Sequence, residues 1–212
     1  MKIYGFPTFN LSKVLLTAEE LNLDYEYIPL DLSKAEHKSD AHLARHPFGK
    51  VPVLELDGAY YIESNSICRF LAEKNDNKLY SEDISQRAYI NQWIDLMAQH
   101  IGRWMTVLFF EEKLKSKFFG GEPDQAQIDE ALGFLEQQLP TLDEALERNA
   151  FIVGDTLTIA DLIAFSYCQT HEYTRLNFET YPHIKQWYQN IKARPSFARA
   201  MENFPQSSIL PE

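Results

Sequence analysis

The spacing of hydrophobic residues divides the chain into two parts of different character. In residues 2–80, short β-rich runs are interleaved with segments whose apolar residues recur at helical spacing. The order is β-α-β-α-β-β-α, with strands expected at 2–6, 25–32, 51–56 and 59–63 and helices at 11–23, 39–46 and 64–74. This order predicts a small α/β domain with a mixed sheet.

Two signals locate features of this sheet. Asp57-Gly58 stands between the last two strand-like runs and favours a two-residue hairpin turn, because both residue types tolerate positive φ. Pro29 lies in the second run, and proline is confined to edge strands or bulges because it lacks an N–H. The sequence therefore predicts a hairpin over 51–63 and an edge position or a bulge for the second strand.

Beyond residue 80 the strand signal ends and helical spacing takes over. Apolar residues at 90, 93/94, 97, 101, 104/105 and 108 predict a long amphipathic helix from Ile84 to about Lys117, which Gly120-Gly121 stops. Further helices are expected at 124–147, 158–171, 183–193 and 196–204. We therefore expect an α/β domain at 1–77, a linker at 78–83 and an all-α domain at 84–212.

One helix-start signal in the second part is specific. Thr158 stands three residues before Asp161 and directly ahead of an apolar run. In a capping box the Thr158 side chain accepts from the N–H of Asp161, and the carboxylate accepts from the N–H of Thr158. We expect a structural role, with about 1 kcal/mol of stability lost when a cap is removed.

Composition and charge narrow the class of partner. The net charge of −11 argues against nucleic acid and anionic membranes as partners. The two cysteines, Cys68 and Cys168, do not form a disulfide framework, and the first residues lack a secretory signal pattern. No run reaches the roughly 20 apolar residues that span a bilayer. We expect a cytoplasmic protein with no metal site and no bound cofactor.

Four stretches, in this order and at these spacings, resemble the cytosolic glutathione transferase family over essentially the whole chain. They are YGFPTFNLSKVLL, AEHKSDAHLARHPFGKVPVLE, IESNSICRFLAEK and GDTLTIADLIAF. The first three are most similar to the phi-like and related bacterial branches. The resemblance implies a thioredoxin-like N-terminal domain and an all-helical C-terminal domain. It also implies an enzyme that conjugates the glutathione thiolate, as co-substrate, to small hydrophobic electrophiles.

The resemblance further implies three subsites for glutathione. It makes Val51-Pro52 a cis bond, so that the backbone of Val51 pairs with the cysteinyl segment like an added strand. At the γ-glutamyl end, Glu63 takes the ammonium while Ser64, at the start of a helix, takes the carboxylate. The glycyl carboxylate is met by three candidate cations: His37, Lys38 and Lys50.

Each of these residues also has a plainer interpretation. Pro52 alone fits a proline that opens a strand at a sheet edge, and Ser64 alone fits an N-cap beside a solvated Glu63. Each candidate cation alone fits a solvated surface residue. Lys50 departs from the glutamine that the family often has there, a change that keeps a hydrogen-bond donor and adds charge.

Two residues of the first loop are candidates to activate the thiol of glutathione. Thr8 lies 29 positions before His37, the register in which phi-like members carry their serine, and is the principal candidate. Asn10, the second candidate, matches the Pro-Thr-x-Asn pattern of the nu-like class, whose activity is disulfide reduction by glutathione. In the plainer interpretation, Asn10 only caps a helix that begins at Leu11.

In the family, the electrophile binds between the first loop and the long first helix of the second domain. The candidate residues here are Phe9, Trp104, Met105, Leu108 and Phe109, with Phe118 and Phe119 as a lid. An aromatic stripe at helical spacing also fits an ordinary core.

Two other functions keep the same fold. One is glutathione-dependent disulfide reduction or peroxidase activity, although the cysteine that related classes place in the first loop is absent from PTFNLSK. The other is a non-catalytic binding or assembly module, which the full set of site residues disfavours. A homodimer is expected, with Phe48 either as an aromatic key inserted into the partner subunit or as a core residue.

Overall fold

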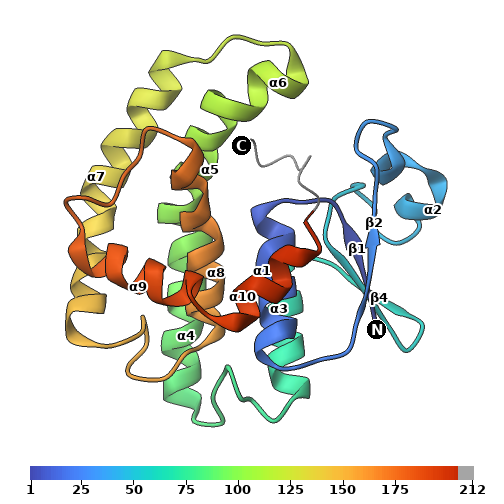
Figure 1. Cartoon of the computed structure of the whole chain (residues 1–212), viewed down its shortest axis with the longest axis horizontal. Helices are drawn as coiled ribbons and strands as arrows, with labels where there is room; N and C mark the ends of the chain where they lie inside the picture. Colours follow the sequence, from blue (N-terminus) through green and yellow to red (C-terminus); the bar gives the residue numbers. More distant parts are fainter. Residues whose placement is uncertain (205–212) are drawn as a thin grey trace. The chain divides into compact units, whose positions relative to one another are not determined.

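The computed structural model describes residues 1–204, which form two compact units. The first unit comprises residues 1–80 and the segment that begins at Arg194, and the second comprises residues 81–193. Figure 1 shows the strands of the first unit and the long helices of the second. Within residues 1–204, no helix combines the length and apolar character that crossing a membrane requires.

The sheet of the first unit has four strands in the order β2-β1-β3-β4. The strands are β1 Lys2–Gly5, β2 Glu26–Pro29, β3 Val53–Leu56 and β4 Ala59–Tyr61. β1 runs parallel to β2 and antiparallel to β3, which in turn pairs antiparallel with β4. The predicted hairpin is confirmed, since Asp57 (φ 52°) and Gly58 (φ 79°) form its turn. The edge position of the strand that ends at Pro29 is confirmed as well.

The helices α1 Phe9–Glu20 and α3 Ser64–Lys74 pack against each other in the first unit. Between β2 and β3 the chain forms the 3-10 turn η1 Glu36–Lys38 and the short helix α2 Asp40–Leu43. The start of α1 lies two residues before the predicted one, because the hydroxyl of Thr8 caps the helix by accepting from the N–H of Leu11. The interpretation of Asn10 as the cap of a helix that begins at Leu11 is therefore wrong.

The last helix, α10 Pro195–Glu202, packs on α1 and belongs to the first unit. The sequence instead predicts a single all-α domain over 84–212. The carboxylate of Glu20 accepts hydrogen bonds from Arg194 at 2.5 and 2.9 Å, and a further one from the hydroxyl of Ser196. These polar contacts join residues more than 170 positions apart in the chain, which a local pattern does not report.

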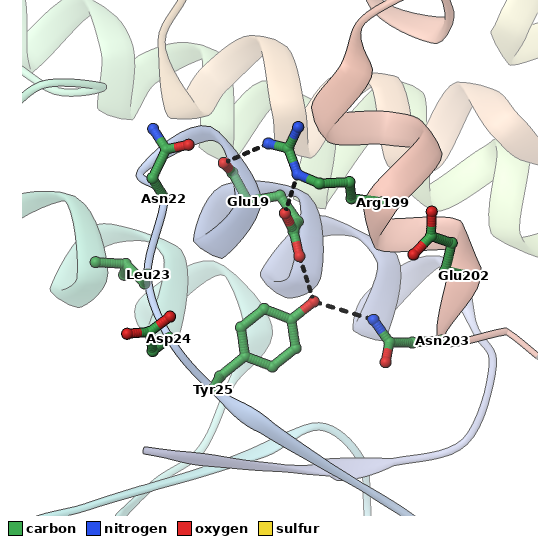
Figure 2. Close-up of a pocket in the computed structure, with 8 residues that line it drawn as sticks. All are labelled: Glu19, Asn22, Leu23, Asp24, Tyr25, Arg199, Glu202 and Asn203. Carbon is green, nitrogen blue, oxygen red and sulfur yellow. Dashed lines mark hydrogen bonds and ion pairs between the residues drawn. The ribbon is translucent and has the colours of Figure 1, made fainter.

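Figure 2 shows a second polar cluster between α1 and α10, beside a pocket of about 430 Å³. The Tyr25 hydroxyl donates to Glu19 at 2.8 Å and accepts from the Asn203 amide at 3.1 Å. Arg199 Nε donates to the same Glu19 carboxylate at 2.6 Å. Glu19 is next to the last residue of α1, so this pocket lies at the opposite end of that helix from Thr8.

The second unit is helical, as predicted. Its first helix runs from Ile84 to Phe119 and contains two π-helical turns, in the order α4 Ile84–Leu96, η2 Met97–Ile101, α5 Gly102–Phe109, η3 Phe110–Leu114 and α6 Lys115–Phe119. It ends at Gly120, whose φ of 67° terminates the helix in the left-handed conformation. The remaining elements are α7 Gln125–Arg148, α8 Ile159–Cys168, the 3-10 turn η4 Gln169–Tyr173 and α9 Pro182–Lys192.

The predicted capping box is present at the start of α8. The carboxylate of Asp161 accepts from both the N–H and the hydroxyl of Thr158, each at 2.9 Å. It also accepts from the N–H of Ile152 at 2.8 Å and from the indole of Trp187 at 3.1 Å. Asp161 is completely buried, so it holds together three segments of the unit as well as capping one helix.

Candidate active site

The loop between β1 and α1 places Thr8 at a helix start with its hydroxyl half-buried. Thr8 Oγ1 accepts from the N–H of Leu11 at 3.1 Å, which occupies one lone pair of the oxygen. A hydroxyl has one hydrogen to donate besides its two lone pairs, so capping leaves the O–H available. Thr8 is therefore able to cap α1 and to donate to an anion in front of it.

Asn10, on the first turn of α1, is joined to the start of α3. Its Oδ1 accepts from the hydroxyl of Ser64 at 3.3 Å, which leaves the two N–H donors of the Asn10 amide unused in this bond. The Ser64 hydroxyl has only this one hydrogen, so its oxygen is an acceptor toward any third group. The donors that remain at this end are the first backbone N–H groups of α3, which lack partners within the helix.

Glu63, directly before α3, has an unusual backbone conformation. Its φ of 67° and ψ of 105° lie outside the regions that a glutamate ordinarily adopts. Strained residues of this kind gather at ligand-binding sites, where the surrounding structure holds them. Its side chain makes no capping bond to α3, and Ser64 is the first residue of the helix, so the interpretation of Ser64 as the N-cap is wrong. Glu63 itself is exposed, which also fits the plainer interpretation of a solvated acid.

Val51 and Pro52 lie just before β3, and the bond between them is cis, as the resemblance implied. Pro52 is buried and leads into a strand that has a neighbour on each side, so the edge-proline interpretation is wrong. Within residues 1–204, neither the N–H nor the C=O of Val51 has a hydrogen-bond partner. The half-buried backbone of Val51 thus presents one donor and one acceptor.

The three candidate cations lie together beside Val51. Gly49 has a φ of +57°, and a Cβ at this position would come within 2.5 Å of the carbonyl oxygen of His37. The backbone of η1 therefore packs directly against the loop that precedes Lys50, and the absence of a side chain at Gly49 makes this contact possible. Lys38 Nζ donates to the carbonyl of Phe48 at 2.9 Å, which fixes that side chain over the same loop.

The sequence predicts His37 as a third cation of this cluster, but its imidazole carries less positive charge than that prediction requires. Burial, and after it electrostatic interactions with Lys38, His42 and Lys50, lower the pKa of His37 below its ordinary value. Its imidazole is therefore mainly neutral at pH 7, and the two lysines supply the positive charge. The side chain packs edge-on against the ring of Phe6 at 5.7 Å, and Nδ1 is buried without a hydrogen-bond partner within residues 1–204.

Two buried residues near this site were missed by the sequence interpretation. His42 on α2 is fully buried, and its Nε2 bonds to the carbonyl oxygen of Lys50 at 2.8 Å. Lys13 on α1 is also fully buried and donates to the Asn65 side chain at 3.2 Å, and burial lowers the pKa of its ammonium to about 7. A lysine and a histidine inside short amphipathic helices give no pattern that separates them from surface residues.

The residues predicted for an electrophile site are distributed over both units. In the first unit, Phe9 is buried below the ammonium of Lys13, at 5.6 Å from the ring centroid. In the second unit, Trp104 stacks on Phe134 at 4.4 Å. The other three candidates, Met105, Leu108 and Phe109, are at most 2% exposed and fit the core interpretation. The proposed lid residues Phe118 and Phe119 are exposed at the end of α6.

The chain is similar in sequence to known proteins over nearly its full length. The model of the glutathione S-transferase N-terminal domain matches residues 1–73, and that of the C-terminal domain matches residues 97–195. Glutathione S-transferase 1 of Zea mays is 34% identical over 200 residues, which cover 92% of this chain and 93% of that protein. The probable glutathione S-transferase GSTF2 of Oryza sativa subsp. japonica is 32% identical over the same shares.

Solved structures give the same result. Glutathione transferase F7 from Populus trichocarpa superposes with a TM-score of 0.88 at 29% identity, over 96% of this chain and 99% of the other. Glutathione S-transferase I from maize, in complex with an atrazine glutathione conjugate, superposes with a TM-score of 0.85 at 33% identity, over 95% and 98% of the two chains.

Proposed function

The chain belongs to the cytosolic glutathione S-transferase family and is a glutathione transferase, and we propose how its first unit binds and activates the thiol. The observation that supports the proposal is the arrangement around Val51. The unpaired N–H and C=O of Val51 lie next to Lys38 and Lys50. The Asn10–Ser64 bond joins the start of α3 to the first turn of α1, the helix that Thr8 caps. These features match the three chemically different segments of glutathione.

Glutathione has a carboxylate at each end and an ammonium at one of them. In the proposed pose, the glycyl carboxylate lies at Lys38 and Lys50, with His37 as a neutral neighbour. The cysteinyl segment pairs with the N–H and C=O of Val51 as a short added strand. The γ-glutamyl carboxylate binds the free N–H groups at the start of α3, and Glu63 takes the ammonium. In a chain of net charge −11, this local positive charge favours an anionic tripeptide.

Activation of the thiol requires that the thiolate be favoured over the thiol. A free thiol has a pKa of about 8.5, so only a few per cent is ionised at pH 7. A hydroxyl donor at Thr8, together with the N-terminus of α1, stabilises the anion by a charge-assisted hydrogen bond. The thiolate then attacks the electrophile, a carbon–sulfur bond forms, and the leaving group departs with the electron pair of the broken bond.

The structure disfavours a protein-thiol mechanism. Cys68 is fully buried, and burial raises the pKa of its thiol to about 11. Cys168 is also fully buried, and burial raises its pKa as well. A buried neutral thiol is a poor nucleophile. Reduction of disulfides or peroxides would then use a second glutathione molecule in place of a protein cysteine.

Calorimetric titration with glutathione tests the proposal directly. Wild-type protein is expected to bind glutathione, and turnover is then measured with a panel of hydrophobic electrophiles, peroxides and mixed disulfides. Conjugation of electrophiles supports the proposed reaction. Turnover of mixed disulfides alone would favour the reductase, and failure to bind glutathione would favour the non-catalytic module.

A further inference from the structure

The buried side chain of His42 contacts the peptide group between Lys50 and Val51. In the proposed site, the N–H of this peptide group is the donor to the cysteinyl segment of glutathione. His42 Nε2 lies 2.8 Å from the carbonyl oxygen of Lys50. A carbonyl oxygen only accepts, so Nε2 carries the hydrogen of this bond. His42 is completely inaccessible to solvent, whereas Lys50 is an exposed residue, so the bond is partly buried.

The geometry of the peptide unit transmits this contact to Val51. The carbonyl of Lys50 and the N–H of Val51 belong to one planar peptide group. That bond is trans, because Val51–Pro52 is the one cis bond within residues 1–204. In a trans peptide the C=O and the N–H point in opposite directions, so a hydrogen bond that fixes the Lys50 carbonyl also fixes the direction of the Val51 N–H.

We propose that His42 is a positioning residue that aims the Val51 N–H at the cysteinyl segment of bound glutathione. The inference rests on the proposed function, since it concerns the same site. His42 is held for this role by α2, whose N-cap Ser39 accepts from the N–H of His42 at 3.3 Å. No other side chain within residues 1–204 bonds to the Lys50 carbonyl, so the histidine is the group that sets its orientation.

The experiment compares His42→Met with His42→Gln. Both side chains are unbranched and of similar size, but only glutamine retains an N–H that reaches the carbonyl. The binding constants of two ligands are measured by calorimetry: glutathione, and its glycyl amide, in which a neutral carboxamide replaces the glycyl carboxylate and the cysteinyl peptide group is kept. His171→Met is the control, because His171 is a half-buried histidine packed against Phe178 in the second unit.

We expect His42→Met to bind both ligands about tenfold more weakly, the effect of about one lost hydrogen bond. The factor is the same for both ligands, because the change lies at the cysteinyl segment. His42→Gln is expected within about threefold of wild type, and His171→Met unchanged. Lys50→Ala, in contrast, should weaken the binding of glutathione and spare that of the glycyl amide.

Three results would overturn the inference. They are equal binding by wild type and His42→Met, equal losses in His42→Met and His42→Gln, and a loss confined to glutathione. If His42→Met does not fold, nitrogen NMR of the wild-type imidazole decides, and a neutral ring with its hydrogen on Nδ1 would refute the proposal. A wild type that binds no glutathione is a separate result that overturns the proposed function itself.

Discussion

At the scale of single residues, the activating group is the most direct test of the mechanism. Replacing Thr8 by alanine removes the proposed O–H donor to the thiolate. We expect the pKa of bound glutathione to rise by one to two units, since a hydrogen bond to a charged group is worth about 1.5–3 kcal/mol and one pKa unit about 1.4 kcal/mol. The rise is measured from the ultraviolet absorbance of the thiolate as a function of pH.

Thr8→Ser is the matched control for this measurement. It keeps both the O–H and the cap on Leu11, so the thiol pKa should stay near the wild-type value. Thr8→Ala also loses the N-cap, at about 1 kcal/mol of folding stability, and the melting temperature of each variant is therefore recorded. If Asn10→Ala raises the thiol pKa while Thr8→Ala does not, the roles are reversed and the reductase gains support.

The residue scale is also where sequence interpretation was least complete. The positions of Val51, Glu63 and the lysine cluster follow from a resemblance that carries them over one by one. His42 does not, because its role depends on the approach of a short helix to the loop before β3. The plainer interpretation of Asn10, as the N-cap of the first helix, is wrong because Thr8 fulfils that role, and the sequence does not separate the two since both residue types are good N-caps and lie two positions apart.

At the scale of helices and strands, the capping box at α8 makes a graded prediction. Thr158→Ala should cost about 1 kcal/mol, the usual value for a lost cap. Asp161→Ala should cost clearly more, about 2–4 kcal/mol, because it leaves the buried donors of Ile152 and Trp187 without an acceptor. Urea denaturation measures both losses.

The same two variants should retain glutathione affinity per folded molecule, because Asp161 lies in the second unit and outside the proposed glutathione site. Equal losses of stability in Thr158→Ala and Asp161→Ala would show that the hydrogen bonds of Asp161 with Ile152 and Trp187 do not stabilise the fold. Loss of glutathione affinity at unchanged stability would contradict a purely structural role.

The attachment of α10 to α1 makes a prediction that depends on pH. Burial opposes ionisation of Glu20, but the hydrogen bonds from Arg194 and Ser196 outweigh it and lower the pKa of the carboxyl below its ordinary value of 4.5. A group with a lowered pKa in the folded state stabilises the fold above its unfolded pKa, and that contribution is lost as the pH falls through the folded value. Glu20→Gln should therefore be less stable than wild type at pH 7. We expect a loss of about 1–3 kcal/mol, smaller than for a fully buried ion pair because Arg194 is partly exposed.

The difference in stability between Glu20→Gln and wild type should shrink below pH 4.5, which thermal melts across pH 3–7 would show. Lys185→Gln serves as a control, since it breaks an exposed ion pair with Glu179 and should change stability little. A constant difference at all pH values would mean that the charge of Glu20 is not the source of the effect.

The elements show which parts of the fold are encoded locally. Strands, helices, the hairpin and the long helix all follow from hydrophobic periodicity and turn residues, and the structure confirms them. The grouping of α10 with the first unit could not be predicted from the sequence. The spacing of apolar residues shows that a helix has one apolar face, but it does not show which surface that face packs against. α10 is joined to α1 by polar contacts such as those of Glu20 with Arg194, which connect residues far apart in the chain.

At the scale of the whole molecule, the exposed aromatic Phe48 bears on assembly. The ring is 68% exposed, so its interpretation as a core residue is wrong, and its one ring contact is with His46 at 6.1 Å within the part of the chain described. A large apolar side chain in water is unfavourable by roughly 1.5–3 kcal/mol relative to burial. The proposed homodimer would remove that cost by covering the ring with the partner subunit.

We predict that wild-type protein sediments as a dimer at micromolar concentration and that Phe48→Ser shifts it toward the monomer. Truncation of an aromatic anchor at an interface typically costs 2 kcal/mol or more, which is a thirtyfold or larger rise in the dissociation constant of the dimer. Tyr60→Ser is the control, because Tyr60 is an exposed aromatic of the same unit with no proposed contact to a partner. Sedimentation velocity over nanomolar to micromolar concentrations measures all three proteins. A dimer of unchanged affinity in Phe48→Ser would reject the key role of this residue, and a monomeric wild type would reject the dimer.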